Sequence, residues 1–132
     1  MDSRGRAAFG ILIAAQATHS IEEYAFRLFD VFGPARFVSG LVSSDLATGF
    51  AVVNAGIVSF GIWCYAARVR PAHSSARAFA WFWVLLELAN GIGHTMLAAS
   101  RGGYFPGLYT APLLIGGSLY LGSRLVARTP RA

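Results

Sequence analysis

Cysteine, lysine and acidic residues are scarce in this chain, and each shortage excludes a class of protein. The single cysteine, Cys64, excludes a disulfide framework and a cysteine-based zinc module. Lysine is absent, and 13% of the residues are charged, against roughly a quarter in ordinary soluble domains. Hydrophobic residues make up 55% of the chain, which excludes an intrinsically disordered protein. We therefore predict a single transmembrane domain that covers residues 1–132.

Four apolar stretches divide the chain, and each is close to the roughly 20 residues that a helix needs to cross a bilayer. Short polar or glycine-containing segments separate them, including Gly33-Pro34 and Arg101-Gly102-Gly103. We predict an all-α fold, a four-helix transmembrane bundle, in which Pro106 lies in the first turn of the last helix. The predicted spans are residues 7–29, 46–67, 78–99 and 105–126.

The 11 basic residues are all arginines, and their positions predict the topology. With four spans, the two termini and the segment between the second and third spans lie on the same side. Only three arginines fall on the opposite side: Arg27, Arg36 and Arg101. By the positive-inside rule, both termini of this multi-pass cell-membrane protein are expected in the cytoplasm. Because the arginines flank apolar runs, the expected partner is the lipid bilayer, and no nucleic acid is expected. The arginines on the cytoplasmic side are Arg4, Arg6, Arg68, Arg70, Arg77, Arg124, Arg128 and Arg131.

The N-terminal segment has a second interpretation. Arg4 and Arg6 precede an apolar run that ends near Ala15-Gln16-Ala17, which resembles a secretory signal and its cleavage site. Cleavage there would remove part of the first span, so the sequence leaves this alternative open.

Ionisable side chains occur inside the predicted spans, where a charge costs roughly 2.5–3.5 kcal/mol. Half of the six acidic residues and two of the three histidines lie there. A rise of about 1.5 Å per residue places them in one layer, between the middle and the outer half of the membrane. Lipid would leave them unsatisfied, so we predict a buried polar cluster. Its members are His19, Glu22 and Glu23 in the first span, Asn54 in the second, and Glu87, Asn90 and His94 in the third.

The residue types of this cluster favour a divalent transition metal, because imidazole and carboxylate together suit Zn, Fe or Mn. Helical bundles build such sites from inward-facing glutamate and histidine. The predicted ligands are His19, Glu23, Glu87 and His94, with Glu22 as the alternative to Glu23. A metal-free alternative is acid–base catalysis by Glu22, Glu23 and Glu87, because clustered carboxylates in a low dielectric keep one of them protonated. A third alternative is that these groups only fix the helix register.

The segment His19-Ser-Ile-Glu22-Glu23 resembles the signature of the HXXEE domain family, which consists of small, largely bacterial integral membrane proteins. Two further elements are similar to that family, an E-x-x-N that begins at Glu87 and a Tyr104-Phe-Pro106-Gly107 turn ten residues after His94. The resemblance spans residues 19–107. It implies that these residues act as one functional set, and it implies no particular reaction.

The remaining polar residues complete the predicted site. Asn54 and Asn90 would orient the ligands or the substrate, and the turn before the fourth span could bring Tyr104 or Tyr109 over the polar layer. Tyr104 would then act as a lid or proton donor, and Tyr109 would contact the substrate.

The sequence thus predicts a small membrane enzyme, metal-dependent in the first interpretation, that acts on a lipophilic small molecule. The alternatives are a cofactor-free isomerase or cyclase of terpenoid- or sterol-like lipids, and a proton- or cation-coupled transporter or ligand-binding membrane protein. Glycines in the fourth span, Gly116, Gly117 and Gly122, offer a face for a homodimer.

Overall fold

The computed structural model describes residues 1–127, which are helical and contain no strand. The all-α class predicted from the sequence is confirmed. The chain forms four long helices. Two short helices lie between the first and the second of them, and a π-helical turn extends the second. In chain order the elements are α1 (Ser3–Ala25), α2 (Leu28–Val31), α3 (Gly33–Val42), α4 (Leu46–Cys64), η1 (Tyr65–Val69), α5 (Ala76–Arg101) and α6 (Ala111–Val126).

Three of the predicted boundaries are wrong. Helix α1 ends at Ala25, before the left-handed Arg27 (φ 55°), so the helix stops short of residue 29. Gly33 and Pro34 begin α3 instead of forming a loop, because proline is tolerated in the first turn of a helix. Pro106 lies in a turn and not in the first turn of α6, where Pro112 occupies that place.

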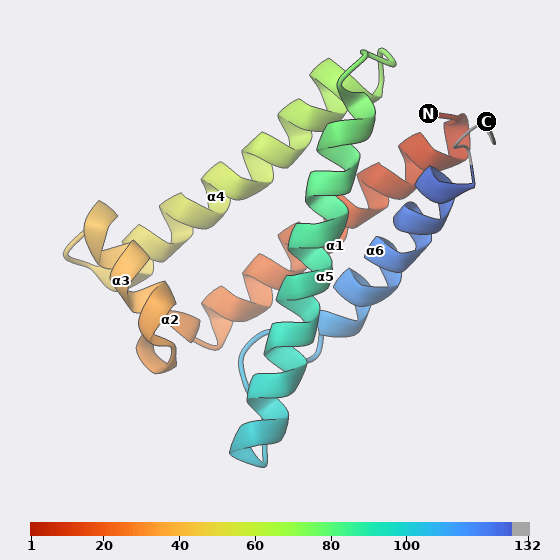
Figure 1. The fold of residues 1–132 in the computed structure, drawn as a ribbon. Coiled ribbons are helices and arrows are strands. Elements are labelled where there is room, and N and C mark those ends of the chain that lie inside the picture. The colour runs from red at the N-terminus through yellow and green to blue at the C-terminus, as the bar shows by residue number, and fades with distance from the viewer. Residues whose placement is uncertain (128–132) are drawn as a thin grey trace.

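The four long helices run in alternating directions (Figure 1). The N-terminus, the end of α6 and the turn between α4 and α5 lie at one end, whereas α2 and α3 lie at the other. Side-chain contacts hold the first end together. Arg124 pairs with Asp2 at 2.8 Å, and Arg77 donates to the carbonyl of Leu125 at 2.8 Å. The N-terminus, the end of α6 and the turn between α4 and α5 are thus grouped as predicted, and Arg128 and Arg131 lie outside the described residues.

Helices α4 and α5 are joined near their connecting turn and then diverge (Figure 1). Aromatic contacts close the joined end, with ring centroids 6.3 Å apart for Phe60 and Phe79 and 5.8 Å apart for Trp63 and Phe79. At the divergent end, α3 packs on α4 instead of α5. Gly49 permits that contact, because a Cβ atom there would lie 2.1 Å from the carbonyl oxygen of Ser39. A cavity lined by residues of α1, α3, α4 and α5 lies there, beside the buried polar residues.

One helical segment among the described residues, Leu46–Val69, is long and apolar enough to cross a membrane, and α6 is a shorter apolar helix. Helices α1 and α5 carry the buried polar residues described below. Large apolar side chains are nevertheless exposed on every long helix. An apolar exterior of this extent is consistent with membrane association. Examples are Ile11, Ile21, Val52, Ile62, Leu85, Met96, Leu113 and Leu119.

Candidate metal centre

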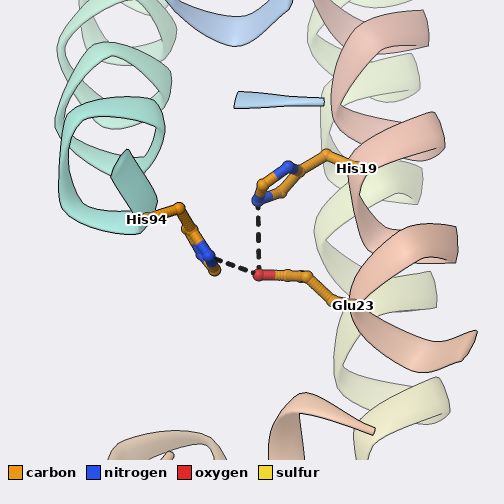
Figure 2. Close-up of side chains that lie close together, drawn as sticks. All are labelled: His19, Glu23 and His94. Atoms are coloured by element: carbon orange, nitrogen blue, oxygen red, sulfur yellow. Dashed lines mark ion pairs between the residues drawn. The ribbon is translucent and has the colours of Figure 1, made fainter. Parts of the chain in front are cut away.

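Three predicted ligands, His19, Glu23 and His94, converge on one buried point (Figure 2). His19 and Glu23 are four residues apart on α1 and therefore share a face of that helix, while His94 projects from α5. Glu23 Oε1 lies 3.3 Å from His19 Nε2 and 3.0 Å from His94 Nε2. A potential ligand atom from each residue lies within 4.8 Å of the other two.

The partners of the outer ring nitrogens assign both histidine tautomers. His94 Nδ1 lies 2.6 Å from the carbonyl oxygen of Pro106, which can only accept, so this nitrogen carries the proton. His19 Nδ1 lies 2.7 Å from the hydroxyl of Thr110. That hydroxyl donates its one proton to Glu22 Oε2 at 2.6 Å and must therefore accept from His19. In the neutral rings, both Nε2 atoms thus present a lone pair to Glu23.

With both rings neutral, three electron-rich atoms face one another, and either protons on the Nε2 atoms or a metal ion between them would satisfy the group. His19 Nε2 is buried without a hydrogen-bond partner, although Glu23 Oε1 is close. Histidines that bind metals usually donate their other ring N–H to a carbonyl or carboxylate, as here to Pro106 and, through Thr110, to Glu22. Ligands about 2 Å from a tetrahedral ion lie roughly 3.3 Å apart, close to the separations around Glu23. The site can therefore hold a divalent metal.

The donor set resembles those of catalytic metal sites. Two imidazoles and one carboxylate leave a coordination position open, as in zinc enzymes with three protein ligands. The same donors form the two-histidine, one-carboxylate set of non-haem iron sites. The side chains allow either metal, and Mn also accepts such donors.

Glu22, the neighbour of Glu23, holds the turn that connects α5 to α6. Its carboxylate accepts hydrogen bonds from the Tyr104 hydroxyl (2.7 Å), from the backbone N–H groups of Gly107 (3.1 Å), Tyr109 (3.1 Å) and Thr110 (2.8 Å), and from the Thr110 hydroxyl. Glu22 therefore positions the residues that hold His19 and His94, and it does not face the common point itself.

The turn places Gly107 directly against both imidazoles. Gly107 has a φ of 96°, and a Cβ atom there would lie 2.5 Å from His94 Nδ1 and 2.7 Å from His19 Cε1. The Tyr104 hydroxyl belongs to the same support, because burial and its hydrogen bond to Glu22 raise its pKa and keep it a donor. The proline–glycine turn therefore supplies both an acceptor for His94 and the space for the two rings.

The structure places the other predicted site residues outside the three-residue group. Glu87 is buried on α5 beside Gln16 and is hydrogen-bonded to Asn90. Asn54 accepts a hydrogen bond from Ser20 at 2.8 Å. Tyr109 is exposed and stacks on Tyr104, with ring centroids 4.6 Å apart. Glu87, Asn54 and Asn90 instead line a neighbouring cavity.

Sequence reasoning missed Thr110, which links Glu22 to His19. A weak signal was present, since a threonine directly before Ala111-Pro112 is typical of a helix start. It also missed Ser20, whose role depends on Asn54 of another helix and therefore leaves no signal in local spacing.

Comparison with known proteins gives a family and no function. A family model described as "Protein of unknown function with HXXEE motif" matches residues 10–121. Neither the curated proteins nor the solved structures contain a match to the chain.

Proposed function

Since the chain belongs to the family of proteins with the HXXEE motif, whose function is unknown, we propose its function from the site: it is a membrane metalloenzyme in which His19, Glu23 and His94 bind a divalent transition metal. One observation carries the proposal. Both imidazoles are fixed by their outer nitrogens, so that Nε2 of each faces the same carboxylate oxygen. Zn, Fe or Mn fits these donors.

An enzyme is favoured over a structural site because, among residues 1–127, three protein ligands converge and not four. Structural zinc sites are usually closed by four protein ligands, whereas catalytic sites keep one position for water or substrate. A metal bound here would polarise a substrate oxygen or activate water. The adjoining cavity is lined by Glu23, one of the three proposed ligands, and would give a substrate access to the site from that side.

The membrane part of the proposal is a four-helix, multi-pass arrangement in which α1, α4, α5 and α6 span the bilayer and both termini are cytoplasmic. It is supported by the alternating directions of the helices and by the apolar side chains exposed around them. The arginines support it too, because most of those among residues 1–127 lie near the end that holds the N-terminus and the turn between α4 and α5. In this arrangement the polar site lies below the membrane surface, and the substrate is lipophilic.

A cofactor-free acid–base enzyme is the second candidate, because one observation also fits it. Glu23 Oε1 lies within ion-pair distance of both histidines, so a proton could occupy the position assigned to a metal. A single proton bridges Glu23 to only one ring, whereas two protons, one on each Nε2, satisfy both rings but place two imidazolium charges beside one carboxylate. The two candidates therefore differ in their metal content.

We expect detergent-purified protein to contain about one equivalent of Zn, Fe or Mn per chain, measured by elemental analysis. His19→Ala and His94→Ala should each lose most of that metal, because each removes one of three ligands. The matched control is His73→Ala, since His73 is exposed in the turn between α4 and α5 and bonds only to neighbours there. A wild-type protein with no metal above background, or a folded His94→Ala variant that keeps it, would favour the acid–base candidate.

A further inference from the structure

A cavity of about 380 Å³ lies between α1, α3, α4 and α5, where α4 and α5 diverge. Its volume falls within the range of small-molecule sites. Val53 and Ile57 of α4 and Leu86 of α5 contribute apolar side chains to its lining, and Leu86 is 40% exposed at the molecular surface. In the proposed orientation this opening faces the lipid between the two helices.

The polar part of the cavity lining belongs to a chain of hydrogen bonds with a fixed direction. Asn54 Nδ2 donates to the backbone carbonyl of Phe50 at 3.1 Å, which turns Asn54 Oδ1 towards Ser20. The Ser20 hydroxyl donates to that oxygen at 2.8 Å and uses its one proton there. Ser20 Oγ must then accept from Gln16 Nε2 at 3.1 Å. The Gln16 oxygen therefore faces Glu87.

This direction makes Glu87 a neutral carboxylic acid. The Gln16 atom that faces Glu87 lies 2.7 Å from Oε2, which is a hydrogen-bond distance, so a proton must lie between the two groups. With the Gln16 oxygen in that position, the proton belongs to Glu87. The opposite orientation of the Gln16 amide would satisfy an ionised Glu87, but it would require the single Ser20 proton for both Gln16 and Asn54. The bond from Asn54 Nδ2 to the Phe50 carbonyl keeps Asn54 Oδ1 on Ser20, so the opposite orientation would leave that oxygen without its donor, and the first arrangement is favoured.

We propose that this cavity binds a neutral lipophilic molecule with one oxygen-containing head group, an alcohol or a carbonyl compound. The polar wall offers carboxamides and a neutral acid, which exchange hydrogen bonds with hydroxyl or carbonyl groups, and the charge of its one carboxylate, Glu23, is directed to two histidines and not to an ammonium head. Glu23, already paired with the histidines, lies at the same cavity and places the head group beside the candidate metal centre. The inference deepens the proposed function, because it names the substrate class of that site.

Photolabelling tests the proposal with a long-chain alcohol that carries a diazirine, applied to the full-length protein in nanodiscs. We expect saturable labelling of α4 and α5 at the cavity. Unlabelled alcohol should compete, and the alkane and the primary amine of equal chain length should not. Val53→Trp fills the cavity and should reduce labelling at least about tenfold. The control is Val52→Trp, because Val52 is 53% exposed on the outside of the same helix and does not line the cavity.

Each other outcome overturns the proposal. Equal labelling of the Val53 and Val52 variants means contact with bulk lipid only, and equal competition by the alkane means a site for an acyl chain. If the primary amine competes with the labelled alcohol more strongly than the unlabelled alcohol does, the cavity binds a cationic head group. Should Val53→Trp fail to fold, Ile57→Phe carries the same expectation. Metal content, measured in the same samples, separates the two proposals. Labelling without metal rejects only the metal centre, and metal without specific labelling rejects only this cavity.

Infrared spectroscopy tests the protonation state of Glu87 independently of ligand binding. The infrared difference spectrum between the wild type and Glu87→Gln should show the carbonyl stretch of a protonated carboxylic acid. If that band is absent and carboxylate bands change instead, Glu87 is ionised and the assignment of a neutral acid to the polar wall is wrong.

Discussion

Replacement of Gly107 by alanine is expected to lower metal affinity by about 10- to 100-fold while leaving the helices intact. The added methyl group would lie 2.5 Å from His94 Nδ1 and 2.7 Å from His19 Cε1. Real Cβ atoms do not approach this closely, so one or both imidazoles must move. Either movement separates the Nε2 atoms from the common point at Glu23. Metal titration of the purified variant, with helix content followed by circular dichroism, measures both effects.

The matched control for this variant is Gly102→Ala. Gly102 also has a positive φ, of 64°, but no atom lies within 4 Å of the position that its Cβ would occupy. Alanine at Gly102 therefore also occupies a left-handed position but makes no contact with the histidines, and this variant should keep its metal. If both alanine variants lost metal to the same extent, turn strain and not the histidine contact would be the cause.

Replacement of either adjacent glutamate of the HXXEE motif by glutamine is expected to have a different effect: loss of metal affinity for Glu23 and loss of stability for Glu22. Glu23→Gln should lose metal affinity at least about 100-fold and keep its stability, because it removes one ligand charge without changing the shape of the side chain. Glu22→Gln should lower the free energy of unfolding by about 3 kcal/mol, because its amide nitrogen must face groups that are themselves donors. Both carboxylate oxygens of Glu22 accept more than one hydrogen bond, so neither orientation avoids the conflict.

Denaturation in detergent, followed with and without added metal, distinguishes these variants. Glu22→Gln should remain less stable than the wild type even in metal-free buffer, whereas Glu23→Gln should differ only when metal is present. Glu87→Gln serves as the control, since this third buried glutamate lies outside the three-residue group and should keep metal. Equal metal loss in Glu87→Gln and Glu23→Gln would contradict the assigned ligands.

The sequence predicted the cluster because its spacing is local. His19 and Glu23 share a helix face by periodicity alone, and the arithmetic of helix rise brings His94 to the same depth. The structure places the His19 and His94 ring centroids 4.7 Å apart. Glu87 lies on the same face as His94, but seven residues correspond to about 10 Å along the helix. That distance explains why the structure places Glu87 at the cavity instead of beside the two histidines.

The different functions of Glu22 and Glu23 could not be read from the sequence. Neighbouring residues on a helix point about 100° apart, and which one faces the partner histidine depends on how α1 is rotated against α5. The backbone donors that hold Glu22 come from a turn more than eighty residues away. The sequence also did not predict α2 and α3. Gly33-Pro34 had indicated a loop, whereas these two residues begin α3.

X-ray absorption spectroscopy of the metal-loaded protein tests the central claim most directly. We predict scattering from two imidazole rings, with nitrogen at about 2.0–2.1 Å from a zinc ion and oxygen in the remaining positions. In His94→Gln the imidazole contribution should fall to one ring. A spectrum without imidazole scattering, or one that His94→Gln leaves unchanged, would contradict a metal centre formed by His19, Glu23 and His94.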